Sequence, residues 1–381
     1  MSSIFELSLA LSNLSIQMKQ LTLPHPAGFI RYLFFYHVAF AFIFTWYLNQ
    51  YGGDAIRYWQ LSAETSHHPQ SWADHFGTRT YFIQWLNYLP SKVLGFPFWL
   101  GNVIYALVSF LALRILFGMV INILPPRPNP WTLCLLYLVF LLPNLHFWTS
   151  GIGKESLSLL GLVLFLKGTQ NLKTSWYLLT FGILLSFFVR PLQGALLLGI
   201  ALPVVCFEKG IHFQLKLLII PIWILVGWHM LQFLLYITHM EGISPTDIMG
   251  FSEEQLSFLD QFAAGSSIPM ESYSWPMKLW TLYFRPMPGE SADFWRLIAG
   301  IENSISLAFF LLPLIFFRKM NWTLTPSWIY WAVLFGFTLM LVYGITLNNL
   351  GIIMRMKSFF MIYFHLMTVA LLSNLKLENN I

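Results

Sequence analysis

Charged side chains are scarce in this chain. Only 10% of its 381 residues are charged, whereas 57% are hydrophobic and 18% are aromatic. Soluble domains have roughly 25% charged residues, so this chain has too few to cover the surface of a soluble fold. Several apolar runs reach about 18 residues, the length that crosses the hydrocarbon core of a bilayer. The sequence therefore predicts an all-α, polytopic transmembrane helical bundle, with residues 1–381 forming a single membrane domain.

Cysteine is almost as scarce. Cys134 and Cys206 both lie within apolar runs, so we expect neither a disulfide framework nor a thiolate metal site. The histidines within residues 67–75 leave a divalent metal possible, but their pattern does not support one, and no cofactor is predicted. The net charge of +5 is typical of a membrane protein with basic cytoplasmic loops and anionic lipid around it. No nucleic-acid motif is present.

Ten apolar segments are candidate membrane spans, and the short fourth to sixth could include a re-entrant piece. Before them, apolar residues within 1–28 recur at spacings of three and four, which predicts an amphipathic helix lying on the membrane surface. The candidate spans are 30–50, 97–123, 131–149, 155–171, 175–190, 193–207, 213–238, 301–317, 327–346 and 356–374.

The distribution of charge predicts the orientation of the chain. With the N-terminus in the cytoplasm, the short inner loops hold about twice as many Lys and Arg as the short outer ones, as the positive-inside rule requires. All carboxylates except Glu6, Glu208 and Glu378 then lie outside or at the outer membrane border. The two long extracytoplasmic loops, 51–96 and 239–300, are both predicted to contain interfacial helices. We therefore expect any chemistry to face outwards.

The first outer loop opens with an acidic residue. Asp54 follows Gly52 and Gly53 at the end of the first span, and Arg57 comes three residues later. The glycines let the backbone turn tightly and approach a ligand closely. Asp54 is either a general base at the boundary of water and lipid, or a solvated loop carboxylate.

The stretch "PNLHFWTSGIGKESL" separates two apolar segments. Lys154 and Glu155 stand where the next helix begins, so the N–H groups of the helix start and the ammonium could receive a phosphate. The glycines lack the spacing of a P-loop. The alternative is a capped turn in which the two charges neutralise one another.

Arginine marks two further outer borders. "FFVRPLQG" places Arg190 at the end of a span, where a snorkelling side chain is the alternative interpretation. "YFRPMPGESADFWRLIAGIEN" contains Arg285 and Glu290, and it ends with Glu302 and Asn303 at the opening of the next span. Arginine can grip a phosphate through two hydrogen bonds and cannot be neutralised.

The last charged border is "NNLGIIMRMKSFF", with Arg355 and Lys357 at the mouth of the final span. All these stretches fall on the same predicted face of the membrane. Together they predict a phosphate-binding site beside an acid–base group. The predicted catalytic residues are Asp54, Glu155 and Glu290, and the predicted phosphate-binding residues are Arg57, Lys154, Arg190, Arg285, Arg355 and Lys357.

These features resemble membrane-embedded polysaccharide-biosynthesis enzymes, including the GT-C class of glycosyltransferases and the O-antigen polymerases. "FWTSGIGKESL", "YFRPMPGE" and "NNLGIIMRMK" are similar to segments of multi-pass proteins from bacterial exopolysaccharide gene clusters. The resemblance implies a polyprenyl-phosphate or polyprenyl-pyrophosphate sugar donor, used on the outer face of the bacterial inner membrane. Its partners would be the lipid-linked sugar and membrane lipid, and could include other polysaccharide-assembly proteins.

The resemblance also implies roles for single residues. Asp54 would match the first-loop carboxylate that acts as catalytic base, and Arg285 and Arg355 would match the cationic residues that hold the lipid phosphate. The chain departs from the pattern because its first loop begins with a single Asp rather than a pair of acidic residues. The large soluble outer domain of some members is also absent.

Two other functions are compatible with this composition. A transporter or flippase of a lipid-linked or anionic solute needs charges near mid-membrane and broken helices in related halves, whereas the middle of most predicted spans is uncharged. A non-catalytic component of a polysaccharide assembly complex does not require charges at the outer ends of helices. A peptidase would need a Ser/His or Cys/His arrangement, and the sequence shows none in a suitable setting. The sequence therefore favours the enzyme.

Overall fold

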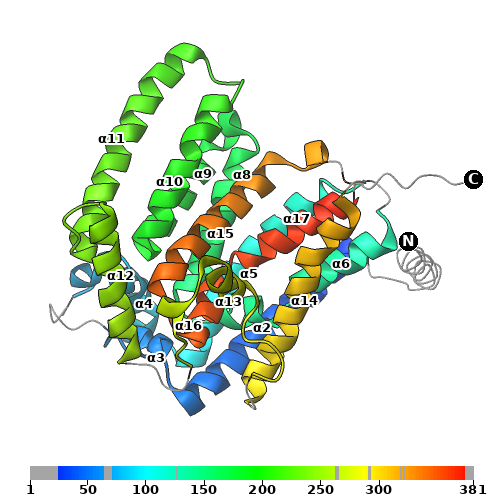
Figure 1. The fold of residues 1–381 in the computed structure, drawn as a ribbon. Coiled ribbons are helices and arrows are strands. Elements are labelled where there is room, and N and C mark those ends of the chain that lie inside the picture. The colour runs from blue at the N-terminus through cyan, green and yellow to red at the C-terminus, as the bar shows by residue number, and fades with distance from the viewer. Residues whose placement is uncertain are drawn as a thin grey trace, which may run out of the picture.

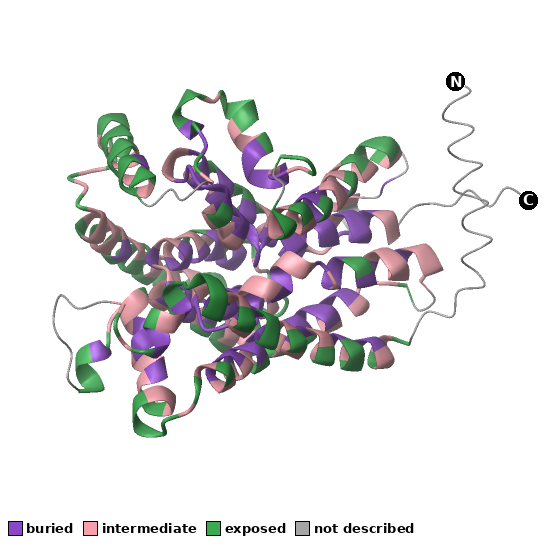
Figure 2. Ribbon diagram, turned by 90° about the horizontal axis from the view of Figure 1, so that it is seen from below, coloured by how far each residue is buried: buried purple, intermediate pink, exposed green. Residues whose placement is uncertain are grey.

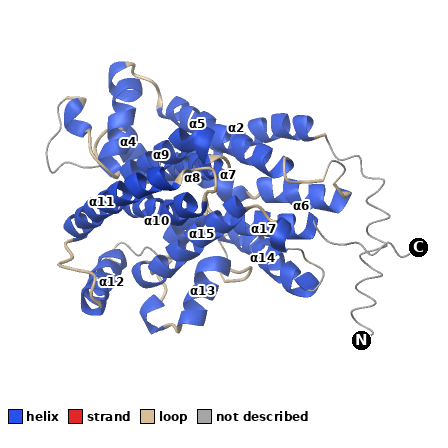
Figure 3. Ribbon diagram, turned by 90° about the horizontal axis from the view of Figure 1, so that it is seen from above, coloured by secondary structure: helices blue, strands red, loops and turns tan. Residues whose placement is uncertain are grey.

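The computed structural model describes residues 25–63, 71–125, 128–261, 266–290, 293–317, 320 and 322–373. Every regular element within these ranges is a helix (Figure 3), which confirms the all-α class. Nearly all of the predicted surface helix at 1–28 lies outside the described residues. The α-helices are α2 (Pro26–Tyr51), α3 (Asp54–Trp59), α4 (Thr80–Asn87), α5 (Phe98–Ile121), α6 (Pro130–Phe140), α7 (Pro143–Thr149), α8 (Lys154–Thr169), α9 (Leu172–Val189), α10 (Pro191–Phe207), α11 (Phe213–Thr238), α12 (Pro245–Asp260), α13 (Trp275–Phe284), α14 (Phe294–Phe316), α15 (Ser327–Thr346), α16 (Leu350–Lys357) and α17 (Met361–Ser373).

The described chain contains seven helical segments long and apolar enough to cross a membrane, so it is a multi-pass membrane protein. They are α2, α5, α6 with α7, α9, α11, α14 and α15. The pair α16 and α17, bent by 53°, adds an eighth if it is one span. Two of the ten predicted spans form α8 and α10, which have only 16 and 17 residues.

Two predicted spans begin earlier than their apolar runs suggested. The segment predicted at 301–317 forms α14, which starts at Phe294 because the Asp293 side chain caps it by accepting the Arg296 N–H at 2.9 Å. Glu302 therefore lies about two turns inside the helix rather than at its opening. The segment predicted at 356–374 is preceded by α16, whose start is capped by the Asn349 side chain.

Both long loops contain helices, as predicted. Residues 51–96 include α3 and α4, and residues 239–300 include α12 and α13. α12 begins with a capping box in which the Ser244 hydroxyl accepts the Asp247 N–H and the Asp247 carboxylate accepts the Ser244 N–H.

Helix α8 lies at the centre of the bundle, and most of its residues are buried. It packs most closely against α9. Glycines allow this approach: a Cβ at Gly182 would lie 2.5 Å from the Gly161 carbonyl oxygen, which is typical of helices that pack closely in membranes. By contrast, α11 lies along the edge of the molecule in Figure 1, and Met230 is its only buried residue. Figure 2 shows the buried residues gathered between the helices.

Candidate functional site

Five charged residues come together from the starts of α3 and α8, the end of α9 and the last turn of α16. We call Asp54, Lys154, Glu155, Arg190 and Arg355 the charged cluster. At its centre the Glu155 carboxylate, with 2% of its side chain exposed, accepts hydrogen bonds from Arg190 and Arg355. The Arg355 Nε lies 2.8 Å from Glu155 Oε1. One buried carboxylate thus holds two guanidinium groups in place.

Asp54 approaches the same arginine from the other side. Its Oδ2 lies 3.0 Å from Arg355 Nη1, and 52% of its side chain is exposed. Gly52, at the end of α2, has a φ of 73°, a left-handed conformation that favours glycine. The predicted tight Gly-Gly turn is therefore present, and it places Asp54 as the first residue of α3.

Lys154 completes the charged cluster. Its Nζ donates a hydrogen bond to Thr80 Oγ1 at 3.2 Å and lies 5.7 Å from the centroid of the Tyr58 ring. Burial raises the pKa of Tyr58, and the positive charge of Arg355 opposes this rise. The phenol below the ammonium therefore remains neutral at physiological pH.

Local sequence explains the geometry of these helix ends. A Cβ at Gly151 would lie 2.1 Å from the Phe44 ring, so only glycine lets the turn before α8 pack against α2. The Ile152 N–H in this turn donates to Asn102 Oδ1 at 2.9 Å. Arg190 is the extended residue between α9 and α10, and Pro191 opens the second helix.

The charged cluster carries an excess of positive charge. Lys154, Arg190 and Arg355 oppose Asp54 and Glu155. Burial, together with the two arginines, lowers the pKa of Lys154 to about 7, so its side chain is partly protonated at neutral pH. Two guanidiniums and one ammonium beside an exposed carboxylate are suited to an anionic group such as phosphate.

The other four predicted site residues lie apart from the charged cluster. Arg285 and Glu290 pair with one another at 2.9 Å. Lys357 is buried and donates to the Tyr283 and Arg285 carbonyls and to Asn303 Oδ1. Lys357 therefore fixes the end of α13 against α14.

Arg57 is exposed, and its one described hydrogen bond is a 3.5 Å contact with the Ala63 carbonyl. It belongs to the same short helix as Asp54, but no contact joins it to the charged cluster among the described residues. Its predicted role in phosphate binding has no geometric support.

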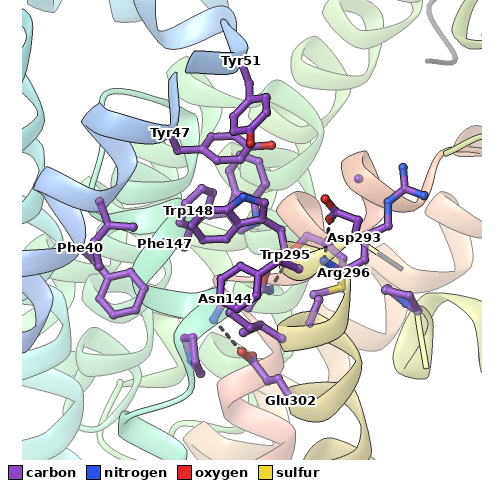
Figure 4. Close-up of a pocket in the computed structure, with 18 of the residues that line it drawn as sticks. Phe40, Tyr47, Tyr51, Asn144, Phe147, Trp148, Asp293, Trp295, Arg296 and Glu302 are labelled. Carbon is purple, nitrogen blue, oxygen red and sulfur yellow. Dashed lines mark hydrogen bonds between the residues drawn. The ribbon is translucent and has the colours of Figure 1, made fainter. Parts of the chain in front are cut away.

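A cavity of about 1200 Å³ (Figure 4) lies next to the charged cluster through Trp148, although no residue of the cluster lines it. Nine of its 22 lining residues are aromatic, and the wall comes mainly from α2, α7, α14 and α16. Trp148 is shared, because its ring lines the cavity and lies 5.8 Å from the Arg355 guanidinium. Phe42, Trp46 and Phe294 line the cavity and are 50%, 52% and 65% exposed. The cavity is therefore open on an apolar side of the bundle.

Two carboxylates at this cavity, Asp293 and Glu302, were not among the predicted site residues. Glu302 of α14 lines the cavity, and its Oε2 accepts the Asn144 N–H at 2.7 Å. The Asn144 side chain in turn donates to the Met354 carbonyl at 3.0 Å. In the sequence Glu302 was visible as a charge beside an apolar run, but its position inside α14 depended on the earlier start of that helix.

Within the described ranges no three His, Cys, Asp or Glu side chains are grouped so as to hold a metal ion. Of the three histidines within residues 67–75, His75 is buried, and His67 and His68 lie outside the described residues.

Comparisons of the chain with protein-family models, with curated proteins and with solved structures gave no match. The resemblance to polysaccharide-biosynthesis enzymes therefore remains a prediction from the sequence motifs.

Proposed function

We propose that this protein is a membrane-embedded glycosyltransferase or polymerase of cell-surface polysaccharide synthesis. It would use a polyprenyl-phosphate or polyprenyl-pyrophosphate sugar on the extracytoplasmic face of the bacterial inner membrane. The observation that carries the proposal is the charged cluster beside an aromatic cavity that is open on an apolar side. Such a site suits a ligand that has both a phosphate and a long apolar chain.

The roles follow from the chemistry of glycosyl transfer. The acceptor hydroxyl oxygen attacks the anomeric carbon, and the bond from that carbon to the phosphate oxygen breaks. Its electron pair leaves with the phosphate, where Arg190, Arg355 and Lys154 stabilise the developing negative charge. A carboxylate takes the hydroxyl proton, and Asp54 is the candidate that the sequence predicts. Direct displacement would invert the anomeric centre and needs no covalent intermediate.

A transporter or flippase of a lipid-linked or anionic solute is the second candidate. The observation that favours it is Glu302, a buried carboxylate within a membrane-spanning helix. Buried charge of this kind is typical of transport pathways. The two candidates differ in their product, because only the enzyme forms a new glycosidic bond.

A deletion strain would test the proposed function. It would be complemented with the wild type, Asp54→Ala, Arg355→Ala or the matched control Arg114→Ala, whose side chain is exposed on α5. We expect shortened surface polysaccharide and accumulated lipid-linked sugar in the deletion strain. The two cluster variants should fail to restore the wild-type pattern at normal protein level, whereas the control should restore it. Full rescue by both cluster variants would rule out a catalytic role for the charged cluster.

A further inference from the structure

The carboxylates of the charged cluster already accept hydrogen bonds from arginine. Glu155 contacts two guanidiniums, and Asp54 contacts one of them, Arg355. The two positive charges beside the buried Glu155 favour its ionised form and make it a weaker base. The proton acceptor for the proposed reaction is therefore better sought among carboxylates at the cavity that lack such a partner.

Glu302 is such a carboxylate. It forms no ion pair with any described residue, and its hydrogen-bond partner is a backbone N–H, that of Asn144. Glu302 is only 8% exposed. A buried carboxylate without a cationic partner gains more from taking up a proton than one held by two arginines.

Glu302 also lines a second, much smaller chamber, whose wall is both polar and apolar. It has a volume of about 10 Å³, which is room for one water molecule. Lys357, Ser306 and His365 also line it. His365 is 1% exposed, and neither of its ring nitrogens has a hydrogen-bond partner among the described residues. A water in the chamber would supply a partner both to His365 and to the Glu302 carboxylate.

We propose that Glu302, rather than Asp54, takes the proton from the acceptor hydroxyl. This inference rests on the proposed function and assigns a further catalytic residue to it. As the hydroxyl oxygen bonds to the anomeric carbon, its proton moves to a Glu302 oxygen, and the phosphate leaves with the electron pair towards Arg355.

The charged groups around Glu302 are compatible with this role. Lys357 of α16 is across the chamber, but its ammonium donates to three other oxygens. Tyr36 of α2 and His365 of α17 are the other titratable groups on packed helices. On α14 itself, Asp293 and Arg296 line the same cavity nearer its start. Among the described residues, no basic side chain lies within ion-pair distance of Glu302.

The first test measures proton binding without any substrate. N,N′-dicyclohexylcarbodiimide reacts with protonated carboxyl groups in apolar surroundings. The full-length protein in lipid nanodiscs would be treated over a pH series, and the adducts located by mass spectrometry. We expect an adduct at Glu302 that decreases as the pH rises, and none at Glu155. The Glu302→Gln variant should lose the adduct. Absence of an adduct at Glu302 over the whole series would overturn the inference.

The second test uses the deletion strain. General-base catalysis contributes about 10²–10⁴-fold to a rate, so Glu302→Gln should lose that factor and accumulate lipid-linked sugar. Glu302→Asp, which keeps a carboxylate, should retain part of the activity. The matched control is Glu241→Gln, which removes an exposed carboxylate 61 positions before Glu302. It should restore the wild-type polysaccharide fully.

The two proposals fail in different ways. If the deletion leaves lipid-linked sugars and polysaccharide unchanged, the proposed function is wrong, whatever the labelling shows. If the deletion accumulates lipid-linked sugar but Glu302→Gln rescues fully, only the role of Glu302 is wrong.

Discussion

Glu155 and Glu290 each accept hydrogen bonds from arginine, but they differ in their exposure to solvent. The Glu155 side chain is 2% exposed and contacts two guanidiniums, whereas Glu290 is 26% exposed and contacts one. Removing one member of a buried charge network leaves the others unpaired in a medium of low dielectric. The same change at an exposed pair has little effect.

We therefore predict different stabilities for two matched variants. Glu155→Gln should destabilise the protein by about 3–5 kcal/mol, and Glu290→Gln by about 0–1 kcal/mol. Thermal unfolding of both in the same detergent would check this. Equal unfolding midpoints for the two variants would contradict the role of Glu155 as the centre of the charged cluster.

The sequence indicated which charged residues at helix ends were candidates for the site. It did not predict which of them contact one another. Asp54, Lys154, Glu155, Arg190 and Arg355 stood out because charge is costly at a membrane border. Their contacts, however, join residues 200 and 301 positions apart. Such pairings depend on how helices pack, and periodicity carries no information about them.

At the scale of elements, the cavity depends on two helices that are distant in sequence. α2 and α14 approach through aromatic side chains, with the Trp46 and Trp295 rings 6.2 Å apart. The start of α14 was not predicted because Arg296 and Glu302 lower the hydropathy of its first turns. As a result, Trp295 was not recognised as part of a membrane helix.

A larger side chain in this cavity should prevent the lipid-linked substrate from binding without affecting the packing of the other helices. Ala299 lines the cavity on α14, whereas Leu311 of the same helix is 47% exposed and does not line it. We expect Ala299→Trp to accumulate lipid-linked sugar in the deletion strain at normal protein level, because the indole occupies the space. Leu311→Trp should rescue fully. If Ala299→Trp also rescued, the cavity would not be the route of the substrate.

At the scale of the whole molecule, composition was enough to predict the fold class. The scarcity of charge and the long apolar runs predicted a helical membrane bundle, and the described chain confirms it. The number of spans was harder to predict, because α8 and α10 are apolar yet shorter than a full crossing. α8 is buried among other helices, and in the sequence it cannot be distinguished from a span that faces lipid.

The central claim is that the charged cluster binds the phosphate of a lipid whose chain lies in the adjoining cavity. The most direct test is native mass spectrometry of the purified protein with a polyprenyl phosphate or with the uncharged polyprenol.

Lys154→Gln is the most informative variant, because Lys154 forms no ion pair with a described residue and the Glu155–arginine contacts stay intact. Arg114→Gln is the matched control. We predict that the wild type and the control retain the phosphate form, that neither retains the polyprenol, and that Lys154→Gln retains less of the phosphate form. Equal retention of the two lipids, or unchanged retention by Lys154→Gln, would contradict the account.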